Sequence, residues 1–393
     1  MGTQSSPNMN ASIAYRNILE VLKERPIISD GSYVFVLEKR GFVKIGPWTP
    51  EVVIEHPEAV LQLHREYLNA GADIIQTFTF FASESRLSIA GKDYDTKLIN
   101  KRACDLAAEI ARPGNAFVCG GVSPTGTYTD GKGKAAVQEE FKQQVNIYVD
   151  NHCDFLLAEF FPYVEEIEWA MEVLKATNKP VAVTMRIGPL GDWAGVSVED
   201  CAIRMAKAGA DIVGINCQFD PDTCLKVIAR MKDALDKEGL KPILMVQPLG
   251  HMVPEVENTY EGYFALPEFP TALESRLLTR HEARKFAREA YDLGVRYIGG
   301  CCGFEPYHIR EMSDELKVER GFEAPGAEKC AAFCVNLNDS PSLKDMDSTK
   351  KKVGRDYWMN LRPSSGRPEN PRLQELQGTL TPKPVVHTNP LNQ

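Results

Sequence analysis

The chain has 393 residues, of which 43% are hydrophobic and 25% charged, a composition typical of a globular protein with one large domain or two ordinary ones. The formal net charge of −9 argues against a nucleic-acid-binding surface. The first ten residues are polar and no apolar run is long enough to cross a bilayer, so we expect neither secretion nor membrane anchoring. Ten cysteines in so long a chain do not indicate a disulfide framework, and we expect a cytoplasmic location.

Eight short apolar runs recur along the chain, separated by segments with helical spacing. The expected strands lie within 27–30, 72–79, 117–122, 154–159, 181–185, 212–217, 243–247 and 297–301. The expected helices include 56–70, 96–111, 138–151, 164–176, 198–208, 222–237, 280–293 and 306–316. Gly71, Gly209 and Gly294 each follow an expected helix and precede a strand, which is the place of a left-handed helix cap.

This alternation of strands and helices predicts a parallel sheet, and eight repeats predict an α/β fold of the (β/α)8 TIM barrel type. A doubly wound sheet is the other possibility, but no GxGxxG motif opens a helix after the first strand. Barrels of this type place their active sites at the C-terminal ends of the strands. We therefore expect the functional residues to lie where the apolar runs end.

Cysteines end two of the expected strands. Cys217 ends the sixth, while Cys301 and Cys302, flanked by glycines, end the eighth. Neighbouring side chains of a regular strand point to opposite faces, so adjacent thiols share one centre only where the backbone leaves strand geometry, as glycine permits. Alternate strands share a side-chain layer inside a barrel, so the three thiols could meet. Three thiolates with one open position compose a zinc site that activates a ligand, and we expect one Zn²⁺ per chain.

Polar side chains end other strands. Asp30 and Gly31 close the first run, Glu159 the fourth and Gln247 the seventh. Each carboxylate could instead be a solvated loop charge or a helix cap, but together with the thiols they indicate a substrate with an ammonium group. The other cysteines lack CxxC spacing and are interpreted as packing residues or free thiols: Cys104, Cys119, Cys153, Cys201, Cys224, Cys330 and Cys334.

Seven stretches of the chain form a recognisable set: SDG at 29–31, LEKRG at 37–41, GPWTP at 46–50, QTFTF at 76–80, AEFF at 158–161, GINC at 214–217 and the segment 295–310. They resemble the zinc-dependent homocysteine methyltransferase family, and within it the betaine–homocysteine S-methyltransferases. The resemblance runs from about Ile18 to Gly366. It implies a (β/α)8 barrel whose zinc is held by Cys217, Cys301 and Cys302.

The resemblance also implies the substrate contacts, with no catalytic residue beyond the zinc site. Asp30, Gly31 and Glu159 are expected to hold homocysteine, and the aromatic faces of Trp48, Phe80, Phe81 and Phe160 to hold the methyl donor. The chain departs from the betaine-using pattern at Phe81 and Phe160, where that pattern has tyrosines. A sister class that uses S-methylmethionine also departs from tyrosine at the position of Phe81, and S-methylmethionine is the alternative donor.

The expected organisation is a flexible N-terminus (1–17), a homocysteine-binding barrel (18–320), an oligomerisation arm (321–370) and a disordered tail (371–393). The tail is rich in Pro, Ser, Asn and Lys, and its Tyr357-Trp358 pair and segment 365–368 look like the oligomerisation arm of the family. We therefore expect a homotetramer or homodimer that acts on small molecules and has neither nucleic-acid nor membrane partners.

The predicted function is zinc-dependent methyl transfer from betaine to homocysteine, giving dimethylglycine and methionine. Two other classes stay open. A barrel aldolase or dehydratase would need a Schiff-base lysine or a carboxylate–metal cluster, and no expected strand ends in lysine. A non-enzymatic barrel scaffold would use its cysteines as a redox pair.

Overall fold

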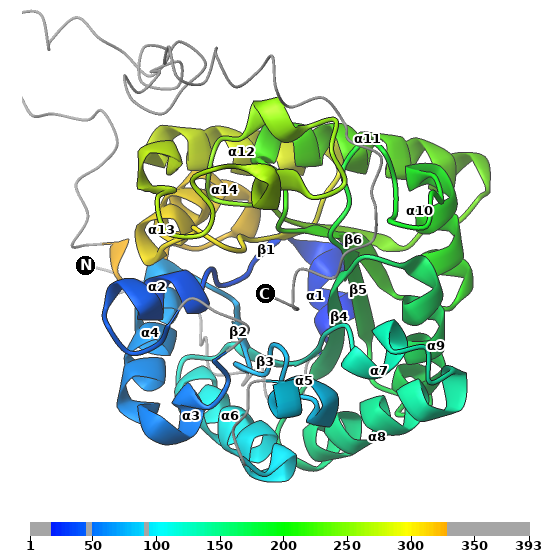
Figure 1. Ribbon diagram of the computed structural model, residues 1–393. Coiled ribbons are helices and arrows are strands. Elements are labelled where there is room, and N and C mark those ends of the chain that lie inside the picture. Colours follow the sequence, from blue (N-terminus) through cyan, green and yellow to red (C-terminus); the bar gives the residue numbers. More distant parts are fainter. Residues whose placement is uncertain (1–16, 45–48, 90–93, 328–393) are drawn as a thin grey trace, which may run out of the picture.

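The structure, a computed structural model, describes residues 17–44, 49–89 and 94–327. Eight parallel strands form a nearly closed barrel that is surrounded by a ring of helices (Figure 1). The strands are β1 (Ile27–Ile28), β2 (Ile74–Gln76), β3 (Phe117–Val122), β4 (Phe155–Phe161), β5 (Val181–Met185), β6 (Ile212–Asn216), β7 (Ile243–Gln247) and β8 (Tyr297–Ile298). Their order in the sheet is β1-β8-β7-β6-β5-β4-β3-β2, and the predicted TIM barrel is confirmed.

The barrel closes at the seam between β1 and β2 without a regular ladder. The amide of Asp73 donates to the carbonyl of Ile28 at 2.7 Å. In return, the amide of Ile28 donates to the Asp73 carboxylate at 2.9 Å. The side chain of Asp73 thus replaces a missing backbone partner where the strands begin.

The longer helices match the expected ones apart from a few residues at their ends. They are α4 (Pro57–Ala70), α6 (Thr96–Ala111), α8 (Lys134–Asp150), α9 (Val164–Lys175), α10 (Val198–Lys207), α11 (Pro221–Lys237), α12 (Arg280–Leu293) and α13 (Pro306–Glu315). Gly71, Gly209 and Gly294 have φ values of 103°, 93° and 106°, so the predicted left-handed caps are confirmed.

Shorter helices lie in segments where no helix was expected. They are α1 (Ile18–Glu24), α2 (Val34–Lys39), α3 (Val52–Glu55), α5 (Glu84–Ile89), α7 (Gly126–Thr129) and α14 (Lys317–Arg320), with 3₁₀ turns η2 (Pro254–Val256), η3 (Gly262–Ala265) and η4 (Glu274–Arg276). The three 3₁₀ turns belong to the long connection between β7 and α12. None of the described helices is long and apolar enough to cross a membrane.

Helix α1 closes the N-terminal end of the barrel. Its buried Ile18, Val21 and Leu22 pack with interior side chains of the strands, among them Phe117 and Phe155. A second, larger apolar layer lies between the sheet and the outer helices. With both faces covered, all seven residues of β4 are buried, as is typical of parallel strands. The opposite, C-terminal end of the barrel is the end left open for a site.

Candidate active site and metal centre

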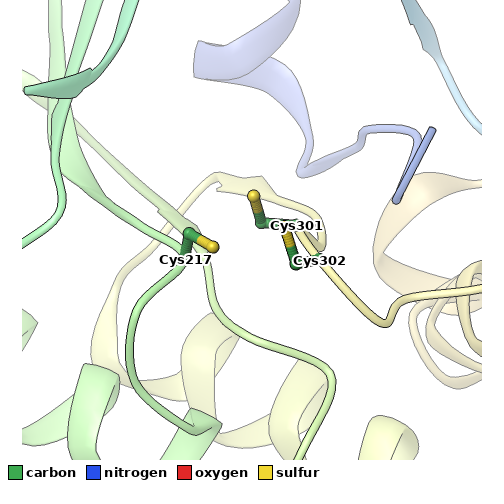
Figure 2. A group of neighbouring side chains, drawn as sticks. All are labelled: Cys217, Cys301 and Cys302. Carbon is green, nitrogen blue, oxygen red and sulfur yellow. The ribbon is translucent and has the colours of Figure 1, made fainter. Parts of the chain in front are cut away.

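The structure brings together the three cysteines that the sequence singled out. Cys217 follows β6 directly, and Cys301 and Cys302 lie on the loop after β8. Their sulfur atoms all lie within 4.8 Å of one another, at the C-terminal end of the barrel (Figure 2). The amide of Cys217 donates to Gln247 at 2.7 Å and that of Cys301 to Pro248 at 2.9 Å, so the end of β7 fixes both backbones.

Close packing explains the glycines before the two adjacent cysteines. A Cβ atom at Gly299 would lie 1.8 Å from the Ser29 hydroxyl oxygen, and one at Gly300 would lie 2.0 Å from the ring of Phe304. Neither residue has a φ in the left-handed region, so the sequence-based expectation of glycine-specific backbone angles is wrong for these two. It holds for Gly303, whose φ is 86°.

The thiol cluster favours one thiolate before any ligand arrives. Burial raises the pKa of Cys217, but hydrogen bonds from Cys301 and Cys302 outweigh it and bring that pKa well below its ordinary value. The same hydrogen bonding to Cys217 raises the pKa of Cys301 and of Cys302. Hydrogen bonding within the cluster therefore favours the thiolate form at Cys217.

A cavity opens beside the thiols, and two carboxylates line it. The side chain of Gln76, at the end of β2, donates to Glu159 Oε1 at 2.5 Å, and its backbone amide donates to Asp30 Oδ2 at 2.8 Å. Burial raises the pKa of Glu159 to about 8 and that of Asp30 to about 6. Two buried acids held by one glutamine form a pocket suited to a cationic group.

A buried chain of hydrogen-bonded side chains lies behind Asp30. The hydroxyl of Tyr33 donates to Asp30 Oδ2 and lies 2.8 Å from Nδ1 of His64. Burial lowers the pKa of His64 to about 3, so the imidazole is neutral. Because the Tyr33 hydroxyl donates its hydrogen to the Asp30 carboxylate, Nδ1 of His64 donates to the oxygen of that hydroxyl. These two hydrogen bonds orient Asp30, and the neutral imidazole places no positive charge beside it.

Aromatic side chains form much of the rest of the cavity wall. They are Phe35, Phe78, Phe80, Phe160, Tyr263, Phe264 and Phe269, with Tyr33 beside Asp30. Phe81 packs against Phe80 with 4.1 Å between ring centroids and is 5% exposed, so it lies behind the wall. Gly31 also lines the cavity, where a Cβ atom would lie 2.6 Å from the carbonyl oxygen of Phe304. Trp48 lies outside the described residues.

Several residues of the site were not expected from the sequence. Tyr263, Phe264 and Phe269 come from the connection after β7, which has no regular periodicity. Arg186 does not line the cavity but packs against two rings of its wall; it follows β5 directly, and its place at a strand end is the signal that the sequence offers for it. The five other described cysteines are buried free thiols, as expected: Cys104, Cys119, Cys153, Cys201 and Cys224.

Comparison with known proteins gives consistent matches. A profile of the homocysteine S-methyltransferase family matches residues 27–316. The chain is 50% identical to betaine–homocysteine S-methyltransferase 1 of Danio rerio over 366 residues, which cover 92% of this chain and 90% of the relative. It is 49% identical to S-methylmethionine–homocysteine S-methyltransferase of Pongo abelii over 365 residues, covering 92% of this chain and 97% of the relative.

Among solved structures, the fold resembles the homocysteine methyltransferase MmuM from Escherichia coli. Its metallated form superposes with a TM-score of 0.58 at 22% identity, covering 76% of this chain and 98% of that chain. Its oxidised form gives a TM-score of 0.59 at 21% identity, covering 76% and 99%. At this identity the likeness bears on the fold, and it agrees with the barrel described above.

Proposed function

Because the chain belongs to the homocysteine S-methyltransferase family, we propose that it transfers a methyl group from betaine to homocysteine, giving dimethylglycine and methionine. The observation that carries the proposal is the convergence of three thiols, two carboxylates and an aromatic wall on one cavity. A redox scaffold has no use for the carboxylates and the wall. A Schiff-base aldolase needs a lysine, and no lysine lies among the described residues that line the cavity.

We propose that Cys217, Cys301 and Cys302 hold one zinc ion. Zn–S bonds of about 2.3 Å place sulfurs about 3.8 Å apart in a tetrahedral site. The sulfurs here lie within 4.8 Å of one another, which fits after a small adjustment. When bound, zinc would favour the deprotonated, nucleophilic form of a homocysteine thiol at neutral pH.

The carboxylate pair would bind the ammonium group of homocysteine. Asp30 and Glu159 have raised pKa values because they are buried, and an ammonium group beside them would lower both values and favour the charged forms. Gln76 fixes Glu159, and Tyr33 fixes Asp30. These contacts would orient the sulfur of homocysteine toward the thiol cluster.

The aromatic wall would hold the onium group of the donor. Aromatic faces attract a cation by about 0.5–2 kcal/mol per contact and offer no competing nucleophile. In the reaction, the homocysteine sulfur forms a bond to the methyl carbon while the carbon–nitrogen bond of betaine breaks, and its electron pair leaves on the nitrogen of dimethylglycine. The homocysteine thiol gives up its proton before this step, so no proton moves as the methyl group is transferred. Because the thiolate and the onium group neutralise each other, exclusion of water favours the transition state.

A donor comparison tests the proposal. Purified protein is loaded with zinc, its metal content is measured, and methionine formation is followed with homocysteine and either betaine or S-methylmethionine. We expect one zinc per chain and transfer from betaine. Transfer from S-methylmethionine alone would reverse the choice of donor, and an enzyme with neither zinc nor transfer would overturn the function.

We also propose that the protein works in the cytoplasm as a homotetramer or homodimer. The free thiols of the described cysteines support the location, because a reducing compartment keeps cysteines unpaired. The Tyr357-Trp358 pair supports the assembly, because large aromatic side chains tend to dominate interface energetics. Both residues lie outside the described part of the chain.

A further inference from the structure

Arg186 lies directly behind the aromatic wall. It follows β5, and its amide donates to the carbonyl of Phe161 at 3.1 Å, which fixes it beside the end of β4. Its guanidinium carbon lies 4.9 Å from the ring centroid of Phe160 and 5.7 Å from that of Phe264, two rings that line the cavity. A third ring, Trp193, lies 4.2 Å away on the guanidinium. The cation is therefore held by three aromatic contacts, two of them to rings of the cavity wall.

The guanidinium has unused hydrogen-bonding capacity. Among the described residues, its Nη1 atom donates to Gln218 Oε1 at a long 3.4 Å, and its buried Nε has no hydrogen-bond partner. No carboxylate of the described residues forms an ion pair with Arg186, and the residue is partly exposed. Burial lowers the pKa of Arg186 to about 10, which leaves it cationic at neutral pH. A guanidinium carries five N–H donors, so most of them are available for a ligand.

Arg86 shows the contrasting, structural arrangement. It also stacks on an aromatic ring, 4.7 Å from the centroid of Phe81, but that ring lies behind the wall. Its Nε and Nη2 atoms donate to the carbonyls of Pro124 and Thr125 at 2.9 and 3.2 Å. Arg86 is thus occupied in holding a loop, and Arg186 is not.

A donor with a carboxylate needs a cationic partner such as Arg186, because the described residues that line the cavity do not supply one. Among the described residues that line it, the ionisable side chains are those of Asp30, Glu159, the three cysteines and two tyrosines, with no lysine, arginine or histidine. Betaine carries a carboxylate next to its onium group, and this carboxylate needs a cationic or hydrogen-bonding partner. Phenylalanine at 160 offers a ring face for the onium group and no hydroxyl for the carboxylate.

We propose that Arg186 binds the carboxylate of the methyl donor, an inference that rests on the proposed function. Nε and an Nη atom on the same edge of a guanidinium suit the two oxygens of a carboxylate. The onium group would lie on Phe160 and Phe264, and the carboxylate would lie between the two positive charges. The ammonium of homocysteine belongs with the acids of β1 and β4, so Arg186 serves the other substrate.

Arg186 in this position should have opposite effects on the binding of two kinds of donor. A donor with a carboxylate gains from Arg186, whereas an onium donor without one meets an uncompensated positive charge. Trimethylsulfonium is such a donor, since its methyl group can pass to homocysteine while dimethyl sulfide leaves. The ratio of the two activities therefore reports on Arg186 more specifically than either rate alone.

The test compares zinc-loaded wild type with Arg186→Gln, using betaine and trimethylsulfonium as donors. We expect kcat/KM for betaine to fall by about tenfold to a hundredfold, mainly through KM, because a hydrogen bond to a charged group is lost. Activity with trimethylsulfonium should not fall, and the KM for homocysteine should stay unchanged. Arg186→Lys, which keeps the charge and loses the planar fork, should lie between the two.

Arg204→Gln is the matched control, because it removes a cation that pairs with Glu168 on the outside of the barrel. It should leave the donor ratio unchanged, and thermal unfolding should show that Arg186→Gln is folded. Equal losses with both donors would mean a packing role and overturn the inference, as would a raised KM for homocysteine. Betaine transfer that Arg186→Gln does not alter overturns this inference alone, whereas a wild type that never uses betaine overturns the proposed function as well.

Discussion

Four residues at the rim of the site are held in a backbone conformation that bulky side chains rarely adopt. Phe81, Phe160, Cys217 and Gln218 have φ values of 55°, 68°, 58° and 65°. Each such residue costs about 1–3 kcal/mol and persists where the surrounding structure compensates for it. At Phe160 the amide donates to the side chain of Asn216 at 2.9 Å, which links the end of β4 to that of β6. Of these four residues, Phe160 and Cys217 line the cavity, so at these two positions the strained backbone accompanies a side chain of the site.

At the same scale, Cys301→Ala should abolish zinc binding and methyl transfer and leave the fold largely intact. Cys301 lies on a loop at the open end of the barrel, where its side chain is partly exposed and supports little of the core. Zinc per chain, methionine formation and thermal unfolding are measured together. Cys224→Ala, which removes a buried thiol outside the cluster, is the control and should keep its zinc. Full zinc and full turnover in Cys301→Ala would refute the metal site.

Glu159→Gln should weaken homocysteine binding and stabilise the protein at alkaline pH. The pKa of Glu159 rises from 4.5 to about 8 on folding, because burial disfavours the charged form. Between these values the folded state binds more protons than the unfolded state, so the contribution of Glu159 to stability falls as pH rises from about 4.5 to 8. Glutamine keeps the hydrogen bond from Gln76 and removes this penalty.

The measurement is the unfolding temperature of both proteins at pH 5 and pH 8.5, together with homocysteine kinetics. We expect the variant to unfold a few degrees higher at pH 8.5 and to differ little at pH 5. The KM for homocysteine should rise about tenfold or more, since a charged hydrogen bond is worth about 1.5–3 kcal/mol. An unchanged kcat/KM for homocysteine would exclude a direct role of Glu159.

At the scale of elements, the two ends of the barrel are covered by different elements. Helix α1 fills one end with apolar side chains, and the connection after β7 brings Tyr263, Phe264 and Phe269 to the other. That connection is fastened by Arg276, 1% exposed, which pairs with Glu255 and Glu268 at 2.5 and 3.0 Å. We therefore expect α1 to contribute mainly to stability and the connection after β7 mainly to the cavity.

Leu22→Ala in α1 should therefore lower stability without altering catalysis. Leu22 is 2% exposed and packs in the interior of the barrel, and a buried leucine shortened to alanine costs about 2–5 kcal/mol. Denaturant unfolding measures the loss, and Lys23→Ala, on the exposed side of the same helix, is the neutral control. If kcat/KM per folded molecule fell together with stability, the separation of the two ends would be wrong.

For the whole molecule, residues 322–326, which follow the last described helix, still pack against the barrel. Phe322 lies under the guanidinium groups of Arg25 and Arg320, at 4.8 and 4.5 Å from its ring centroid, and Ala324 is buried. The amide of Gly326 donates to Asn69 at 3.1 Å. A truncation meant to test the arm must therefore come after this segment.

A chain that ends at Ala327 should fold as a barrel and lose its self-association. The expectation follows from the aromatic pair at Tyr357 and Trp358 in an otherwise polar tail. Sedimentation of the truncated and full-length chains decides it, with Tyr357→Ala/Trp358→Ala in the full-length chain as the second variant. An oligomer unchanged in both would reject the arm as the interface.

Much of the architecture follows from local features of the sequence. The apolar runs, the helical spacing between them and the glycines at 71, 209 and 294 depend on neighbours within a few residues, and the barrel with its helix caps came out as expected. The positions of Cys217, Asp30 and Glu159 at strand ends were also readable, because a parallel barrel collects such ends on one face.

The tertiary structure decided what depends on distant neighbours. Strand β2 ends at Gln76, earlier than its apolar run, so strict alternation no longer governs Phe80 and Phe81. Gly299 is required because Ser29, far away in the sequence, leaves no room for a Cβ atom. Gly300 is required because Phe304, in the following turn, leaves no room for one either. The place of Arg186 among three rings depends on β4, on β5 and on the connection after β7 at once. Such contacts produce no periodic pattern in the sequence, because they join residues that lie far apart along the chain.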